Sequence, residues 1–171
     1  MFYNIASAHL NRSDILSEYY TRKILKQIAS ATDYKSLNSI GMNILMAMLH
    51  EHPFKPIAMI CGPISTGGKG SRNENLKIFS RAIDRASAGG LFVFSQMPFE
   101  NDMERIYKSN QNLQGTRLLE EFYLPMFNSG LIKLLCFIPD WEHSVGARWK
   151  HEQAEVLHIP RIDLSDKYIL D

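Results

Sequence analysis

Residues 131–164 read LIKLLCFIPDWEHSVGARWKHEQAEVLHIPRIDL, and this stretch decides the fold class. Its first run, LIKLLCFI, is short and apolar, which is typical of a buried strand. Ser144 is a natural N-cap, so a helix is predicted behind it from residue 145 to about residue 157. The run IPRIDL then predicts another short strand. A strand, a helix and a strand in this order form a right-handed unit of a parallel sheet.

The same pattern extends toward the N-terminus as far as residue 56. PIAMIC predicts a strand over 56–61, and LFVFS predicts one over 91–95. A helix is predicted over 73–88, ended by Gly89 and Gly90, and another over 117–129. Residues 96–116 are polar and rich in Asn and Gln, so we expect a long loop with little regular structure. The alternation of strands and helices predicts an α/β fold, a doubly wound parallel sheet of four to five strands.

Residues 1–55 are predicted to be a helical extension of the α/β domain at 56–171. Ser13 and Asp14 can cap a helix that runs to about residue 31. A second helix is predicted over 34–50, and its run IGMNILMAML is apolar nearly all round, so it must be buried against the main domain or a second subunit. We expect the packing residues to be Ile40, Ile44, Leu45 and Met48.

The composition is that of an ordinary globular chain. Hydrophobic residues make up 45%, charged residues 22%, and the formal net charge is +1, so neither a nucleic-acid nor a membrane partner is expected. Cys61 and Cys136 lie in apolar runs, which favours buried thiols in a reducing compartment. The N-terminus lacks the pattern of a signal peptide, and no apolar run reaches the roughly 18 residues needed to span a bilayer. We therefore expect a cytoplasmic protein.

Three loops follow the predicted strands, the first at 62–72, the second at 96–116 and the third at 139–146. They are the candidate site, because ligands of such sheets bind beyond the carboxyl ends of the strands. The first loop, GPISTGGKGSR at 62–72, is rich in glycine and precedes a helix, where backbone amides favour anions. Lys69 and Arg72 add positive charge to it. The loop is neither a Walker A motif nor GxGxxG, so a flexible turn with solvated charges stays an equal alternative. The histidines lack metal-ligand spacing, and we expect no metal and no cofactor.

Lys150 is the unusual residue of the helix predicted behind the third loop, from residue 145 to about residue 157. It shares a stripe at helical spacing with Ala147, Ala154 and Leu157, so its side chain is predicted to point toward the mouth of the site. The alternative is a lysine that extends past the edge of the sheet into water. Trp141, in the loop before this helix, can stack on a base or cover the core.

Parts of the chain resemble the nucleoside 2-deoxyribosyltransferase superfamily, including its deoxynucleoside 5′-monophosphate N-glycosidase branch. The resemblance covers about 56–165 and rests on CGPIS with Asn75 and Phe79, on GGLFVFS, and most of all on the stretch from YLPMF to VLHIP. It implies a flavodoxin-like sheet, an oligomeric assembly, and cleavage or exchange of the bond between a base and a deoxyribose. A glutamate nucleophile and an assisting aspartate perform this chemistry in the family, because negative charge must face an oxocarbenium-like transition state.

Neither catalytic carboxylate is present at its family position. The resemblance places the nucleophile at Lys150 and the aspartate at Phe127, and it places the turn that holds the 5′-phosphate at Ser144 and Gly146. A displaced carboxylate would have to come from another position, and the candidates are Glu120, Glu121, Glu142 and Glu152. The predicted ligand-binding set is Gly62, Pro63, Ile64, Ser65, Gly67, Gly68, Met97, Trp141, Ser144, Gly146 and Lys150.

Three functional hypotheses follow from these residues. The favoured one is a pocket that holds a nucleotide, a nucleoside or a sugar phosphate without cleaving it, an inactive member of the family. The alternative is an active N-glycosidase or deoxyribosyltransferase with a displaced carboxylate. The third is a structural protein whose N-terminal helices build a homo-oligomer. One fold hosts many functions, so the site must decide among them.

Overall fold

The chain forms an α/β fold around a parallel sheet, as the alternating pattern predicts. The computed structural model describes residues 18–68, 70–110 and 115–170. Its sheet contains β1 (Ile57–Cys61), β2 (Phe92–Val93), β3 (Ile132–Phe137) and β4 (Arg161–Asp163), all parallel, in the order β2-β1-β3-β4. This is the flavodoxin-like order. The strand order changes direction at β1, because β2 lies on one side of β1 and β3 on the other. Ligands of doubly wound sheets bind at such a point.

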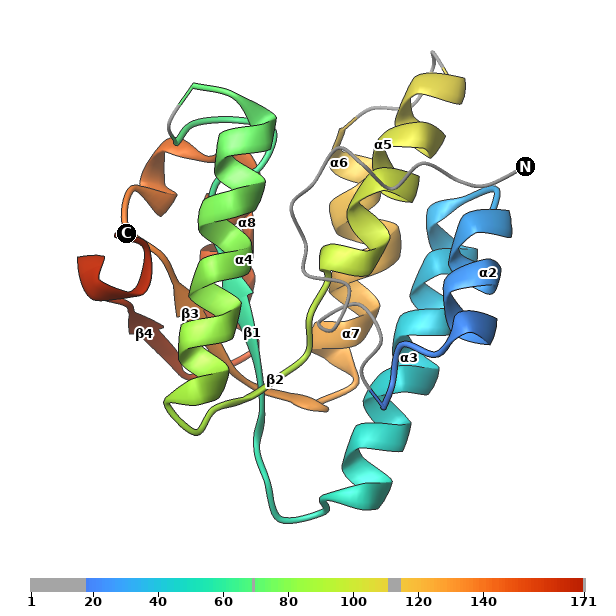
Figure 1. Ribbon diagram of the computed structural model, residues 1–171, viewed down its shortest axis with the longest axis horizontal. Helices are drawn as coiled ribbons and strands as arrows, with labels where there is room; N and C mark the ends of the chain where they lie inside the picture. The colour runs from blue at the N-terminus through green and yellow to red at the C-terminus, as the bar shows by residue number, and fades with distance from the viewer. Residues whose placement is uncertain (1–17, 69, 111–114, 171) are drawn as a thin grey trace.

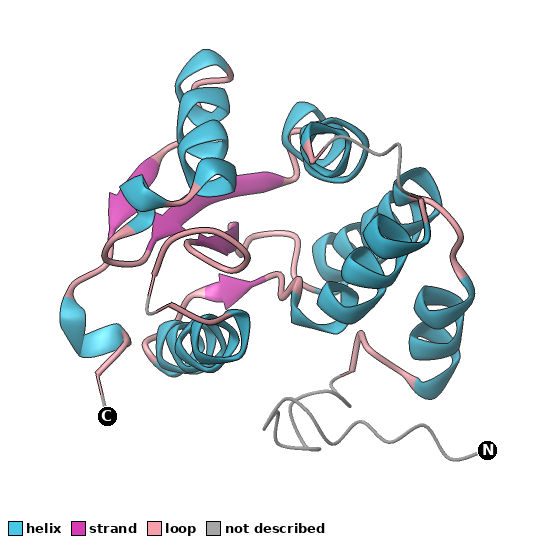
Figure 2. Cartoon of the chain, turned by 90° about the horizontal axis from the view of Figure 1, so that it is seen from above, coloured by secondary structure: helices cyan, strands magenta, loops and turns pink. Residues whose placement is uncertain are grey.

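Helices cover both faces of the sheet (Figures 1 and 2). Alternate residues of β1 face opposite ways. Ala58 and Ile60 pack with α4 (Arg72–Ala88), whereas Met59 and Cys61 pack in the larger cluster on the other face. That larger cluster includes α7 (Leu124–Asn128) and α8 (Val145–Val156). The 17-residue α4 begins at the side-chain cap of Ser71 and ends at Gly89, so the predicted helix is confirmed.

The N-terminal helices belong to the same core. The helix α3 (Tyr34–Glu51) buries Ile44, Leu45 and Met48 in the larger cluster, and Ile40 packs against it partly buried, as predicted. The helix before it, α2 (Arg22–Ser30), begins later than predicted, because the side chain of Thr21 caps it and residues 18–21 are not helical. Ser13 and Asp14 lie outside the described residues.

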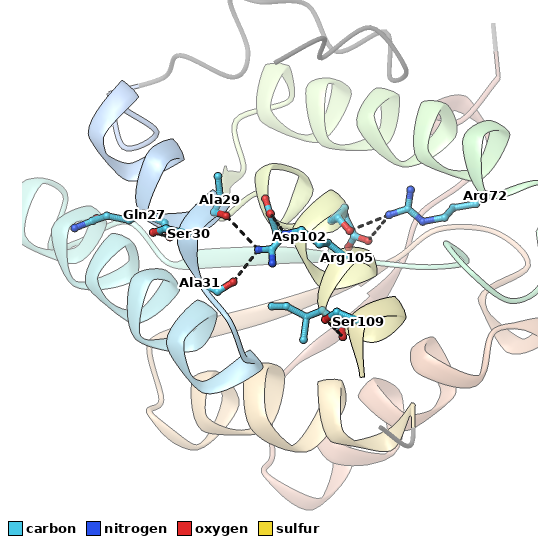
Figure 3. Close-up of polar contacts among 10 residues, drawn as sticks. Gln27, Ala29, Ser30, Ala31, Arg72, Asp102, Arg105 and Ser109 are labelled. Atoms are coloured by element: carbon cyan, nitrogen blue, oxygen red, sulfur yellow. Dashed lines mark hydrogen bonds and ion pairs between the residues drawn. The ribbon is translucent and has the colours of Figure 1, made fainter. Parts of the chain in front are cut away.

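The prediction of an irregular loop over 96–116 was wrong. The structure has a short 3-10 turn, Met97–Phe99, followed by the helix α5 (Glu100–Ser109). Its apolar positions, Phe99, Met103 and Ile106, have helical spacing and are buried, although polar residues surround them in the sequence. Arg105 fixes the outer face by donating to the carbonyl oxygens of Ala29 and Ala31 at the end of α2 (Figure 3).

The predicted helix over 117–129 is interrupted by a π-helical turn. It is composed of α6 (Thr116–Leu118), a π segment at Leu119–Tyr123, and α7. π turns of this kind are frequent at functional sites. The predicted helix and strand of the third segment are confirmed as α8 and β4, with a 3-10 turn at Trp141–His143 before them and another at Asp166–Tyr168 after them. In the part of the chain that the structure describes, the helices are too short or too polar to cross a membrane.

Candidate functional site

The first and third loops meet at the carboxyl ends of β1 and β3. The hydroxyl of Thr66 accepts a hydrogen bond from the backbone N–H of Val145, with a distance of 3.1 Å. The side-chain amide of Asn75 holds the first loop in shape, since it donates to the carbonyls of Ile64 and Gly67 at 3.0 and 2.9 Å. Ser144 caps the first turn of α8, as predicted, by accepting from the N–H of Ala147.

The two loops are closed on each other in this structure. The cavity beside them has a volume of about 10 Å³, room for about one water molecule. Its walls are Pro63, Gly68, Asn75, Ile78, Ile138, Pro139, Asp140 and Ile169. This cavity is too small to hold a nucleotide. The bond from Val145 to Thr66 is exposed, and such a bond contributes only about 1 kcal/mol.

Gly67 controls how closely the loops approach, and its replacement gives a testable prediction. Its φ is +72°, and a Cβ built there lies 2.5 Å from the carbonyl oxygen of His143. Gly67→Ala is therefore expected to add a backbone clash to the 1–2 kcal/mol or so that a left-handed conformation costs. The first loop should lose its contact with α8, measured as faster hydrogen exchange of the Val145 amide.

Gly70→Ala is the matched control for that prediction. Gly70 also has a positive φ, +95°, but a Cβ added to it would meet no atom within 4 Å. The alanine at this position has the strain without the clash. Equal exchange rates for Val145 in the two variants would show that the loop does not depend on the close approach at Gly67.

Lys150 is buried on the inward face of α8 together with Ala147 and Ala154, and it is not among the residues that line the small cavity. Its side chain is 5% exposed, and its Nζ lies 3.6 Å from the centre of the Tyr123 ring. Burial lowers the pKa of Lys150, and the neighbouring Cys61 and Glu100 oppose that shift. Within the described residues, the side chain of Lys150 has no hydrogen bond or ion pair. An ammonium in this position is expensive unless a charged or polar partner reaches it.

Glu100 is the carboxylate whose charge acts on Lys150. It is the first residue of α5 and is buried. Arg72 is the first residue of α4. Its Nη2 lies 3.6 Å from Oε2 of Glu100, and its Nη1 lies 3.3 Å from Oε2 of Glu104. Burial raises the pKa of Glu100, while Lys150 and Arg72 oppose the rise. The site therefore has a lysine and a carboxyl group that burial pushes toward their neutral forms.

Glu100→Gln is expected to become more stable relative to the wild type as the pH rises. A raised pKa in the folded state means that Glu100 contributes stability below its unfolded value, about 4.3, and that this contribution is lost as the pH rises through the folded value. Glutamine is neutral throughout, so it avoids the loss. Urea unfolding at several pH values between 4 and 7 measures the difference.

Glu104→Gln is a control with the opposite sign. Lys108, through a side-chain hydrogen bond, is the main cause of a lowered pKa at Glu104. The stability that Glu104 contributes is present above its unfolded pKa and is lost as the pH falls. Glu104→Gln should therefore become less stable relative to the wild type as the pH rises. A difference with the same pH dependence in both variants would contradict the assigned environments.

A second buried polar atom accompanies Lys150 near the end of β1. Gln96 follows β2 and is fully buried, and its Nε2 donates to the carbonyl of Ile60 at 2.9 Å. Its Oε1 has no hydrogen-bond partner among the described residues. Buried acceptors are rarely left in this state, so a ligand or water is expected to reach it.

The other predicted residues divide into those at the site and those away from it. Met97 is buried beside Ile60 on the α4 face, at the same end of the sheet. Trp141 covers the core: its ring stacks on His151 at a centroid distance of 4.3 Å and packs against Phe137. Ser65, Gly67, Gly68, Glu120, Glu142 and Glu152 are exposed, Ile64 and Gly146 are partly buried, and Gly62 and Pro63 are buried.

Tyr123 and Phe127 lie on the helical segment before β3 and have different neighbours. Phe127 is buried and stacks against Trp149. Tyr123, one turn earlier on the same helix, is the residue that contacts Lys150. Glu121 pairs with Arg117 at 2.6 Å. The sequence analysis did not single out Tyr123 or Glu100, and the polar character of 96–116 concealed the helix in which Glu100 is buried.

The chain was compared with family models, with curated proteins and with solved structures, and no match was found. In the described residues, no group of three or more His, Cys, Asp or Glu side chains is placed to hold a metal ion.

Proposed function

We propose that this chain binds a nucleotide or a sugar phosphate at the edge formed by the first loop, the start of α8 and Lys150, and that it does not cleave the ligand. The observation that carries the proposal is the buried Lys150, which has no ion pair within the described residues. A phosphate within about 4–6 Å would supply the missing partner and keep the lysine protonated. The resemblance to nucleoside 2-deoxyribosyltransferases supports a nucleotide-sized ligand.

The start of α8 supports the same location for the anion. A helix N-terminus favours negative charge, and Val145 and Ala147 direct their N–H groups to hydroxyl oxygens that a phosphate oxygen can replace. Arg72 adds a guanidinium nearby, although it is paired with Glu100 and Glu104 in this structure. The ligand would therefore displace the Thr66 hydroxyl as the first loop opens.

Calorimetric titration of the whole chain tests this proposal. We expect a deoxynucleoside monophosphate to bind more tightly than the matching free nucleoside, because only the former pairs with Lys150. Raising the salt concentration should weaken the binding of the monophosphate and leave the binding of the nucleoside nearly unchanged. Equal affinities for the two ligands would contradict a phosphate site.

An active N-glycosidase is the second candidate function, and the buried Glu100 favours it. A carboxyl group with a raised pKa is suited to act as a general acid toward a leaving base. Incubation with deoxynucleosides and their monophosphates, followed by chromatography for free base, distinguishes the two functions. Release of base that Glu100→Gln abolishes would establish the enzyme, and release that Glu142→Gln or Glu152→Gln abolishes would assign it to one of the exposed carboxylates.

A further inference from the structure

A hollow of about 280 Å³ lies at the amino-terminal ends of β1 and β3. Its floor is apolar and is formed by Leu49 of α3, by Ile57 at the start of β1 and by Leu131 just before β3. The five residues of β1 span roughly 16 Å, so the hollow is separated from the proposed phosphate site by the length of a strand. Figure 1 shows the connection from α3 to β1 and the connection from β1 to α4 at opposite ends of the sheet.

The turn between α3 and β1 forms the rim of this hollow. The N–H of Lys55 donates to the carbonyl of His52 at 3.1 Å, which closes the turn. Pro53 and Phe54 lie at its corner, and the proline ring fixes φ there, so the rim has a defined shape before a ligand arrives. Phe54 is 96% exposed. A rigid aromatic side chain at the edge of an apolar hollow gives a flat ring a surface to pack against.

Two lysines make the rim positively charged. Lys55 and Lys133 both line the hollow, and both are exposed. Among residues 18–68, 70–110 and 115–170, neither of them has an ion pair with a carboxylate. The ammonium of Lys55 lies 5.7 Å from the centre of the Phe92 ring, a contact that contributes little at an exposed position. Two cations without carboxylate partners beside an apolar floor are complementary to one negative charge on an apolar body.

We propose that this hollow binds a small carboxylate that carries one aromatic ring. The ring covers the apolar floor, and the carboxylate lies within reach of Lys55 and Lys133. The volume sets the size of the ligand, because a cavity of about 150 Å³ already accommodates benzene and drug-sized ligands need about 300 Å³ or more. A second copy of the chain is a poor occupant, since a two-fold contact would bring the same lysines of both copies together. The site is separate from the phosphate site and does not depend on the proposed function.

Calorimetric titration of the whole chain with 3-phenylpropanoate tests the proposal, with the neutral 3-phenylpropanamide as the matched ligand. We expect half-saturation by the carboxylate at about 1 mM or below, the range for a ligand of this size. The amide should bind at least about threefold more weakly, because only the carboxylate pairs with the lysines. In amide NMR spectra, the carboxylate should shift residues 54–57 and 130–133 and leave 62–68 and 145–150 unchanged.

Single substitutions place the ligand in the hollow. Phe54→Ala and Lys133→Met should each weaken the binding of 3-phenylpropanoate by about two- to fivefold. Both side chains are exposed, so the fold should persist, and circular dichroism checks it. Lys77→Met, an exposed lysine on α4, is the matched control and should leave the affinity unchanged. Lys150→Glu should also leave it unchanged, so a failure of this inference is distinguishable from a failure of the phosphate site.

Three results would overturn the proposal. Equal affinities for the carboxylate and the amide would contradict the role of the two lysines. Half-saturation only above about 1 mM, or NMR shifts confined to 62–68 and 145–150, would contradict a site in the hollow. A wild-type dimer in sedimentation that Phe54→Ala dissociates would show that a second copy of the chain occupies the hollow instead.

Discussion

Replacing Phe122 with alanine is expected to lower the free energy of unfolding by about 3–5 kcal/mol, the range for a large buried aromatic side chain. Its ring is fully buried and packs against Phe99 and Tyr123 at centroid distances of 5.2 and 4.9 Å. The same cluster contains Leu45 of α3 and Leu135 of β3. The N-terminal helices and the sheet therefore share one core, and urea unfolding should show a single transition by circular dichroism and by tryptophan fluorescence.

Phe54→Ala is the matched control for the same substitution on the surface. Phe54 is 96% exposed, so its loss should change stability by less than about 0.5 kcal/mol. Two separate transitions in the wild type would contradict the shared core. A loss below about 1 kcal/mol for Phe122→Ala, far under the usual cost of such a cavity, would contradict the packing around the ring.

Lys150→Met is expected to raise the free energy of unfolding by about 1–3 kcal/mol at neutral pH, the scale for relieving a buried polar group that lacks a partner. Methionine has a similar length and makes a favourable sulfur contact with an aromatic ring, here that of Tyr123. The same variant should lose its ligand. A gain in stability with a loss of binding is typical of residues kept for function.

The control is Lys77→Met, a lysine that is exposed and paired with Glu74 at 3.1 Å. Its replacement should change stability by less than about 0.5 kcal/mol. If Lys150→Met instead destabilises the protein, the lysine makes a net favourable structural contact. That result would remove the main support for a site in which Lys150 binds an anion.

The sheet and the orientation of Lys150 could be predicted because each rests on a strong local pattern. The apolar runs around Ile60 and Cys136 are short and bounded by glycine or proline, as buried strands are. The alanines at 147 and 154 define the inward face of α8, and a lysine between them at helical spacing has no other direction. The N-cap at Ser144 sets the register of that helix.

The remainder of the site depends on contacts between segments far apart in the sequence. Glu100 is buried because α5 packs through Met103 and Ile106, and polar neighbours hid that periodicity. The contact between Tyr123 and Lys150 joins two helices, and no local pattern predicts it. The π turn at Leu119–Tyr123 also departs from α-helical spacing, so a 3.6-residue period does not predict which side chains of this segment face the core.

The most direct test of the central claim compares calorimetric titrations of the wild type and Lys150→Glu with one deoxynucleoside monophosphate. The substitution changes the charge beside the phosphate by two units, so we predict that affinity falls at least about tenfold, the loss of one charge-assisted contact. Lys150→Met removes only one unit of charge, so its affinity should fall between those of the wild type and Lys150→Glu. Equal affinities for the wild type and Lys150→Glu would show that Lys150 does not contact the ligand and would contradict the proposed site.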